Sequence, residues 1–248
     1  MKILVCISSV PDTTSKINFT ADKSAFDKNG IQWVINPLDE FALTKAVKLQ
    51  ESQGATVTVL NVGDAGTEAV IRKALAIGAN DAVRVNAEAK DSFSVAKEIA
   101  KVAQDGGYEL ILMGKESIDY NGGAVPGMVA QLLNIPFVNA SVGLEVNGSE
   151  ATAVREIEGG KETISVRLPA VVAGQKGLVD EKDLIIPNMR GIMSARTKVL
   201  NVVEPSNFEV KVEAVSFDSV APRAAVKLVS ADNLDELVRL LHEEAKVI

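Results

Sequence analysis

Short, largely apolar runs alternate with segments of helical spacing along the first half of the chain. The runs occupy residues 3–7, 56–62, 82–85 and 110–113, and such runs are typical of strands that a parallel sheet buries on both faces. Between and after them, apolar residues recur at helical spacing over about 37–53, 67–77, 92–103 and from about 125. This alternation predicts an α/β fold with a doubly wound, mostly parallel sheet and right-handed crossovers.

Residues with known preferences for helix ends support these boundaries. Asn36 is a good N-cap residue, and Pro37 suits the first helical position. Gly54 and Gly78 are expected to end the first and second helices. Residues 8–12 carry turn chemistry and predict a loop, and weak alternation over 13–35 predicts a hairpin-like excursion.

The pattern changes after Pro136. Residues 137–147, 150–158 and 163–168 read as antiparallel strands, with turns at Asn147-Gly148 and Gly159-Gly160. A further buried run follows at 170–173. We therefore expect antiparallel strands added at the edge of the sheet.

The last third of the chain shows weaker patterns. Residues 176–196 are predicted to be irregular, and a loop of this length in a compact domain is usually functional or mobile. Residues 199–229 predict an extended arm, after which Ser230 is expected to cap a final helix with one apolar stripe. We assign 1–200, including the segment 182–196, to one α/β domain, and 201–248 to a C-terminal arm and helix that pack on something else.

The stretch 109–133 offers the first candidate site, because an apolar run there ends at Gly114 and a glycine-bearing loop leads into a helix. Helix N-termini present unpaired N–H groups and favourable dipoles to anions such as phosphate. In open α/β sheets, ligands bind beyond the carboxyl ends of the strands, here at the loops 8–12, 62–66 and 114–125. The spacing matches neither the P-loop nor the dinucleotide fingerprint, so the motif alone leaves the ligand open.

Composition narrows the possible chemistry. The net charge of −7 argues against nucleic acid as a main partner. With one cysteine, Cys6, and one histidine, His242, the usual zinc sites cannot be assembled, and Cys6 within an apolar run reads as a buried small hydrophobe. The chain enters a predicted strand at once, and no apolar run reaches the roughly 18 residues of a membrane span. We expect a cytoplasmic protein without membrane insertion.

Four segments together resemble the beta subunits of the electron transfer flavoproteins. They are Asn36-Pro37-x-x-Glu40, Gly114-Lys115-x-x-Ile118-Asp119, the hairpin Val154-Arg155-Glu156-Ile157-Glu158-Gly159-Gly160 running to Leu168-Pro169-Ala170-Val171-Val172, and Arg190-Gly191-Ile192. The third is the most specific of these segments. The resemblance covers residues 1 to about 200 and, more loosely, the rest of the chain.

The resemblance implies an adenine-nucleotide-binding fold in an electron carrier that is not itself a catalyst. Such a beta subunit forms a heterodimer with an alpha subunit that carries FAD, and in most members it holds AMP. By position, the residues implied in nucleotide binding are Cys6, Asn36, Val62, Gly63, Gly114, Lys115, Ser117, Asp119, Asn121, Gly122, Gly123, Ala124 and Val125. Bland readings remain open at several of these positions, since Asn36 could be a plain N-cap, Asp119 a turn residue and Lys115 a solvated side chain.

The resemblance also implies a docking segment for partner enzymes. The apolar anchor aligns with Met189, and Arg190, Ile192 and Met193 complete an expected contact surface. Methionine suits an adaptable contact. The implied partners are acyl-CoA dehydrogenases as electron donors and a membrane flavoprotein–quinone oxidoreductase as acceptor.

Two alternatives remain at this point. In an electron-bifurcating branch of the family, a second FAD replaces AMP. Its loop continues Val-Gly-Pro, whereas this chain reads Val125-Pro126-Gly127, so we favour AMP. The other alternative is a stress-response-like module that binds ATP on a similar fold, although such a module would not need residues 137–248.

Overall fold

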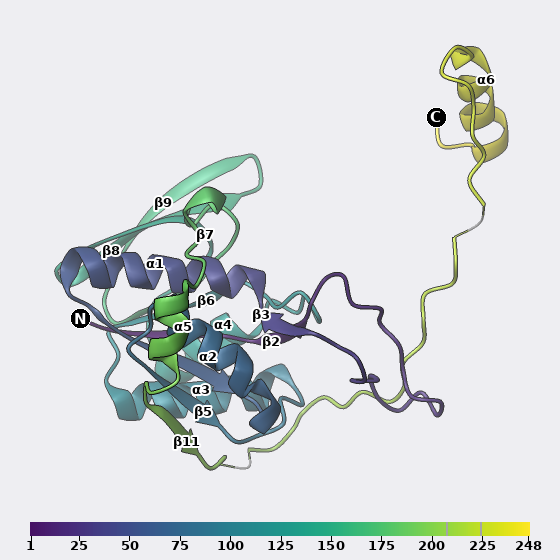
Figure 1. The fold of residues 1–248 in the computed structure, drawn as a ribbon. Coiled ribbons are helices and arrows are strands. Elements are labelled where there is room, and N and C mark those ends of the chain that lie inside the picture. The colour runs from purple at the N-terminus through teal and green to yellow at the C-terminus, as the bar shows by residue number, and fades with distance from the viewer. Residues whose placement is uncertain (207, 224) are drawn as a thin grey trace. The chain divides into compact units, whose positions relative to one another are not determined.

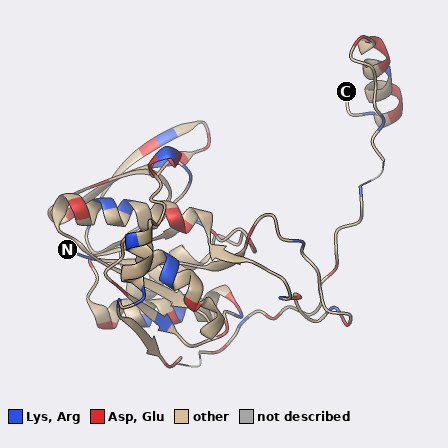
Figure 2. Cartoon of the chain, in the orientation of Figure 1, with Lys and Arg blue, Asp and Glu red and all other residues tan. Residues whose placement is uncertain are grey.

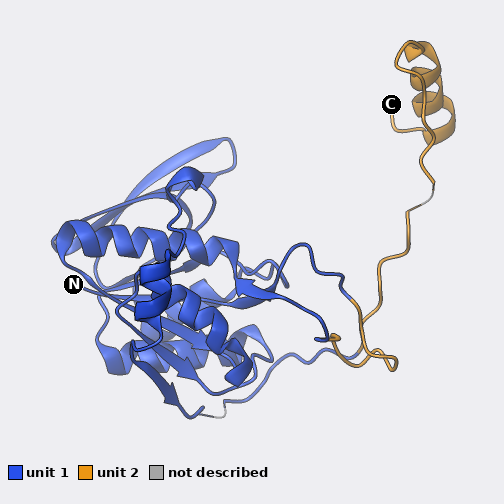
Figure 3. Ribbon diagram, in the orientation of Figure 1, with its two compact units in different colours: residues 1–17, 28–215 blue, residues 18–27, 216–248 orange. Residues whose placement is uncertain are grey.

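The computed structural model describes residues 1–206, 208–223 and 225–248, and these form two compact units (Figure 3). Unit 1 comprises residues 1–17 and 28–215, and unit 2 comprises residues 18–27 and 216–248. Unit 1 is built on one nine-stranded sheet with the strand order β11-β5-β4-β1-β6-β10-β7-β8-β9 (Figure 1). The predicted α/β fold with a mostly parallel sheet is confirmed.

The parallel centre of the sheet contains the four predicted strands, with ends that differ from the expected ones by one residue or not at all. These are β1 (Lys2–Cys6), β4 (Thr56–Val62), β5 (Asp81–Val85) and β6 (Leu110–Gly114). The connecting helices are α1 (Pro37–Gln53), α2 (Glu68–Ile77), α3 (Ser92–Gly106) and α4 (Val125–Leu133). A short 3₁₀ turn, Ala65–Thr67, precedes α2.

The sheet separates two apolar layers, because successive side chains of a strand point to opposite faces. In β1, Ile3 and Val5 pack with the α1 and α2 side, and Leu4 and Cys6 pack with the α3 and α4 side. Both layers consist mainly of aliphatic residues. Burial on both faces explains why these strands read as continuous apolar runs.

The added strands lie on one side of this centre. β10 (Ala170–Gly174) pairs parallel with β6 and with β7 (Phe137–Asn147). β8 (Glu150–Ile157) and β9 (Gly160–Arg167) then continue the sheet as antiparallel strands to its edge. At the opposite edge, β11 (Leu200–Val203) pairs parallel with β5, so the assigned boundary at residue 200 falls within a strand.

The first loop differs from the prediction. We expected turn structure over 8–12, but β2 (Ser9–Pro11) pairs antiparallel with β3 (Trp33–Ile35). Val10 is fully buried and lies opposite Val34 in this pair, a contact that the local turn residues did not reveal. The expected excursion over 13–35 starts and ends at this small ribbon.

The segment 176–196 was predicted to be irregular, but it contains a 3₁₀ turn, Glu181–Asp183, and the helix α5 (Met189–Ala195). The Asn188 side chain caps α5 by accepting a hydrogen bond from Gly191 N at 2.8 Å. Arg72 Nη1 of α2 donates to the carbonyls of Ala195 and Lys198. A seven-residue helix that contains a glycine depends on such tertiary contacts, so local pattern could not predict it.

Unit 2 joins a short N-terminal hairpin segment to the end of the chain. The rings of Phe19 and Phe217 stack with centroids 5.3 Å apart, and Lys23 forms an ion pair with Asp218. The last element is α6 (Leu234–Arg239), which continues as a π-helical turn, Leu240–Ala245. Ser230 was predicted to cap this helix, but Asn233 does so by accepting a hydrogen bond from Glu236 N.

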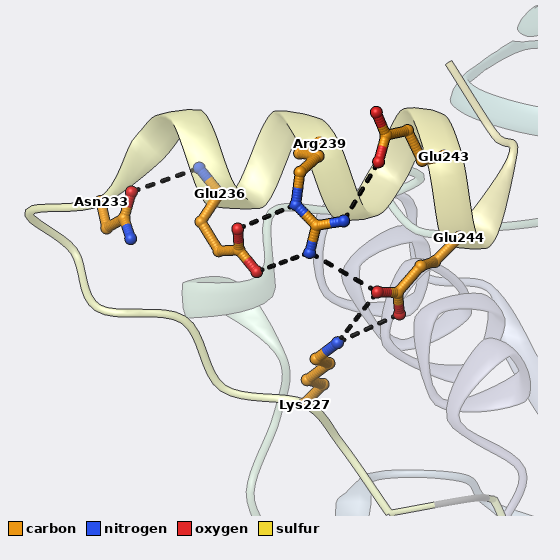
Figure 4. Close-up of polar contacts among 6 residues, drawn as sticks. All are labelled: Lys227, Asn233, Glu236, Arg239, Glu243 and Glu244. Atoms are coloured by element: carbon orange, nitrogen blue, oxygen red, sulfur yellow. Dashed lines mark hydrogen bonds and ion pairs between the residues drawn. The ribbon is translucent and has the colours of Figure 1, made fainter.

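The polar side of this C-terminal helix centres on Arg239 (Figure 4). Its guanidinium contacts Glu236 at 2.9 Å and Glu243 at 3.1 Å, and Lys227 pairs with Glu244 at 3.0 Å. The apolar side chains of Leu234, Leu237 and Val238 remain exposed. The helix is therefore amphipathic, as predicted, with its apolar side uncovered within unit 2.

Replacing Gly191 with Ala should destabilise unit 1, because the new Cβ would lie 2.5 Å from the backbone oxygen of Ala76 and neither backbone can yield easily. We expect a loss of about 1–3 kcal/mol in the free energy of unfolding, measured by denaturant titration. Gly160→Ala is the control, since its Cβ would meet no atom within 4 Å. Equal stabilities of the two variants would contradict the close packing of α5 on α2.

Candidate functional site

The candidate nucleotide residues gather where the strand order reverses. From β1 the chain adds β4 and β5 on one side, and then crosses to place β6 on the other side of β1. Cys6, Val62 and Gly114 are the last residues of the adjacent strands β1, β4 and β6. In doubly wound sheets this switch point is the usual position of a ligand.

A buried carboxyl group joins two of these strand ends. Asp39, in the first turn of α1, accepts hydrogen bonds from Ser8 N at 2.8 Å and from Gly114 N at 2.7 Å. Gly114 leaves no room for a side chain, because a Cβ there would lie 2.6 Å from Asp39 Oδ1 and 2.7 Å from Leu38 Cβ. The glycine therefore permits the contact on which the start of the loop depends.

Burial raises the pKa of Asp39 to about 7, although hydrogen bonds from Ser8, Gly114 and Asn36 act in the opposite direction. Sequence reasoning did not select Asp39 as a site residue. An acid at this position of a helix commonly serves the N-terminus of its own helix. Nothing local indicates that this one reaches back to two strand ends.

Asn36 holds the middle of the loop. Its side-chain amide donates to the carbonyl of Glu116 at 2.9 Å and accepts from Ile118 N at 3.2 Å. It lies at the N-cap position of α1 but makes no side-chain capping bond to that helix. The bland reading of Asn36 as a plain N-cap is therefore wrong, because its fully buried side chain serves the loop instead.

Further contacts shape the loop 114–125. Lys115 N donates to Gly174 O at 2.8 Å, and Asn121 N donates to Ser117 O at 2.8 Å. Asn121 and Gly123 adopt positive φ angles of 49° and 59°. Asp119 accepts from the N–H of Tyr120, as a turn residue does.

Side chains of the loop divide into paired and exposed ones. The Lys115 ammonium lies 3.5 Å from Glu116 Oε1, so it has a neighbouring acid within the loop. Tyr120, which sequence reasoning did not select, is 75% exposed at the tip of the loop.

The helix that follows the loop begins without a side-chain cap. Ala124 occupies the N-cap position of α4 and has no acceptor, and Pro126 has no N–H. The N–H groups of Val125 and Gly127 in the first turn therefore lack intrahelical partners. Together with the open glycines Gly122 and Gly123, this arrangement fits the phosphate of a nucleotide.

On the β4 side, the site is tightly packed. A Cβ at Gly63 would lie 2.6 Å from Thr67, and Gly63 O accepts from the buried Arg84 at 3.0 Å. Arg84, which sequence reasoning also missed, forms no ion pair within the described residues. Burial raises the pKa of the Cys6 thiol, and the nearby Asp39 carboxyl adds to this, so Cys6 behaves as the buried small hydrophobe that the sequence indicated.

The predicted docking residues lie on and beside α5. Met189 is 74% exposed, and Ile192 and Met193 are also exposed. Ile186, which was not selected, is the most exposed of this group at 84%. A hollow of about 300 Å³ is lined both by this segment and by the end of α2, with Ile186, Arg190 and Lys198 in its lining. The basic residues here are interspersed with acids on neighbouring elements (Figure 2).

The described residues contain neither a membrane-spanning helix nor a cluster of metal-binding side chains. No helix in 1–206, 208–223 or 225–248 combines the length and the apolar character needed to cross a bilayer. In the same ranges, no group of three or more His, Cys, Asp or Glu side chains is arranged to hold a metal ion.

Asp39 predicts a pH dependence of stability. Its pKa lies near 7 in the folded chain against a usual 3.8, so the folded chain binds one more proton between these values. The free energy of unfolding should therefore fall as the pH rises from about 4 to 7, by up to about 4 kcal/mol from this group, and then level off.

The variant Asp39→Asn should lose this slope, which denaturant titrations at pH 5 and pH 8 measure. Any constant cost of the amide cancels in the comparison of the two pH values. Asp232→Asn, at an exposed position of unit 2, should retain the slope of the parent chain. Equal slopes for Asp39→Asn and the parent would show that the carboxyl does not titrate in this range.

Comparisons with known proteins identify the family of this chain. A family model described as the electron transfer flavoprotein domain matches residues 24–207. The chain is 34% identical to the electron transfer flavoprotein subunit beta of Bacillus subtilis, with all of both chains covered. It is 33% identical to the mitochondrial subunit beta of Oryza sativa subsp. japonica, again over both full lengths. It is 30% identical to the human subunit beta, over all of this chain and 99% of the human one. The chain belongs to the electron transfer flavoprotein beta subunit family.

Proposed function

We propose that this chain is the beta subunit of a heterodimeric electron transfer flavoprotein and holds AMP as a structural nucleotide. The observation that carries the proposal is the loop 114–125, which Asp39 and Asn36 fix over the ends of β1 and β6 beside the uncapped start of α4. We add Asp39 to the residues that the resemblance implies in nucleotide binding. FAD would be held mainly by the alpha subunit.

The donor set suits an adenosine monophosphate. The N–H groups at the start of α4 and the open glycines would receive the phosphate. Val62, at the end of β4, is partly exposed and offers apolar surface for a flat base. The rigid attachments of Asn36 and Asp39 mean that the loop need not be ordered by the ligand, which reduces the entropic cost of binding.

In the heterodimer, FAD would supply the electron-carrying chemistry. This chain would complete the flavin site and present the surface that partner enzymes contact. The donors would be acyl-CoA dehydrogenases and related flavoenzymes in the cytoplasm, and the acceptor a membrane flavoprotein–quinone oxidoreductase. A weak and rapidly exchanging contact suits an electron carrier.

Docking of the donors would use α5 and the segment before it. Met189, Ile192 and Met193 offer exposed apolar contact, to which the structure adds Ile186. Arg190 and Arg196 would form part of a charged rim around these side chains. Arg72 and Lys198, which bind α2 to this segment, would hold the surface in place before docking.

The residues after 200 would pack on the alpha subunit. More than half of the large exposed apolar side chains of the described residues lie after residue 198. A series of exposed valines and leucines of this length is typical of an interface and not of a free surface.

Denaturing the purified heterodimer and identifying the released nucleotides tests the proposed function. One FAD and one AMP per dimer are expected. Two FAD without AMP would instead assign the protein to the electron-bifurcating branch. ATP without flavin would favour the stress-response-like module.

If this segment docks the donors, Met189→Ala and Ile186→Ala should each lower kcat/KM for reduction of the flavin by an acyl-CoA dehydrogenase by about tenfold. The reason is that an apolar anchor buried in a partner contributes at least about 1–2 kcal/mol to binding. Stopped-flow flavin reduction measures this effect, with flavin content unchanged. The control is Ile157→Ala, an exposed apolar residue at the end of β8, the strand next to the edge strand β9. Rates equal to the control in both variants would refute the docking role of this segment.

A further inference from the structure

The helix α3 carries a stripe of polar side chains that contact a distant segment of the chain. Asp91, at the N-cap of α3, and Ser94, Glu98 and Lys101 follow helical spacing along one side. Each of the last two contacts Ser206: its N–H donates to Glu98 Oε1 at 2.7 Å, and its hydroxyl accepts from Lys101 Nζ at 2.7 Å.

Asp91 binds the other end of the same segment. One carboxylate oxygen caps α3 by accepting from Ser94 N at 2.8 Å. The other oxygen accepts from Lys211 N at 2.6 Å and from Val212 N at 3.1 Å. Burial acts to raise the pKa of Asp91, but these hydrogen bonds outweigh it and hold the pKa at about 2, so the carboxylate stays charged at neutral pH.

Between these two attachments lies an aromatic clamp. The Lys97 ammonium lies 5.0 Å from the centre of the Phe93 ring and 4.9 Å from that of Phe208. Such cation–π contacts contribute little interaction energy at exposed sites, but they restrict the orientation of the ring. Ser206, Phe208, Lys211 and Val212 are thus attached to α3, and their order along the chain runs opposite to the helix.

The attached segment directs apolar side chains away from these contacts. Val212 is 70% exposed and Val215 is 91% exposed, and Val210 is exposed as well. The neighbouring charges of Glu209 and Lys211 pair with each other. A segment that is fixed by its backbone and shows valines to solvent has lost most of its conformational entropy before any partner binds.

We propose that Asp91 and Lys97 of α3 are positioning residues that hold Ser206 and residues 208–212 as a preformed docking segment for the alpha subunit, which covers Val210, Val212 and Val215. The inference rests on the proposed heterodimer, and it adds the element that fixes the start of the C-terminal arm. A protein partner is favoured over an anionic membrane, because acids alternate with the valines at Glu209 and Glu213 and the chain as a whole is acidic.

The test uses variants that leave α3 intact. Asp91→Asn keeps one carbonyl oxygen for the helix cap but presents an amide donor where two backbone N–H groups need an acceptor. Glu98→Gln is the matched control, because Ser206 N needs a single acceptor that the amide oxygen still provides. Lys97→Ala removes the clamp on Phe208.

Two measurements on the whole chain test whether α3 holds the docking segment. In hydrogen exchange, Lys211 and Val212 should be protected in the parent chain and in Glu98→Gln, and exposed in Asp91→Asn. In titrations with the alpha subunit of the same organism, Asp91→Asn and Lys97→Ala should each raise Kd by about tenfold or more, with Glu98→Gln near the parent value.

The outcomes are separable from those of the proposed function. An alpha subunit that does not bind the parent chain would refute the heterodimer itself. Normal binding by Asp91→Asn, despite lost protection, would overturn only the role of α3. If Asp91→Asn instead lost self-association of this chain, a second copy of the chain would be the partner that covers the valines. That result would also overturn the inference.

Discussion

The buried Asp39 carboxyl is the contact on which the candidate site depends. A carboxyl removed from water costs several kcal/mol unless hydrogen bonds compensate it. Here the compensation comes from the N–H groups of Ser8 and Gly114, which leave the ends of two adjacent parallel strands. Those N–H groups would otherwise be unpaired where the sheet stops. One side chain thus satisfies two strand ends and fixes the direction in which each chain leaves the sheet.

The start of α1 serves the loop more than it serves its own helix. Asn36 and Asp39 occupy positions whose side chains commonly bind the first N–H groups of a helix. In this chain, both side chains reach outward, Asn36 to residues 116 and 118 and Asp39 to the strands. The loop 114–125 is therefore held by a rigid helix in addition to its own turns. A rigid loop favours a nucleotide retained for structure, since little ordering has to accompany binding.

The parts of the fold that the sequence predicted are those decided by burial on one or two faces. The central strands and helices follow from apolar periodicity, and their glycine ends are local signals that tertiary contacts do not change. The short elements β2, α5 and β11 were missed, and the cap of α6 was predicted at Ser230 instead of Asn233. Val10 in β2 and Gly191 in α5 take their conformation from distant partners, which no local pattern contains. The same holds for the site, where the loop glycines were identifiable but Asp39 and Ile186 needed the assembled structure.

Several acidic side chains of the chain make internal hydrogen bonds that composition alone did not suggest. Asp91, Glu98 and Glu109 each accept a hydrogen bond from a backbone N–H far away in the sequence. Charge-assisted bonds of this kind are stronger than neutral ones, and an acid has no donor that would compete with the N–H group. Part of the negative charge thus replaces backbone pairing at strand ends and along the C-terminal segment, where no neighbouring strand is present to supply an acceptor. The net charge of −7 therefore reflects contacts inside the chain as well as contacts with partners.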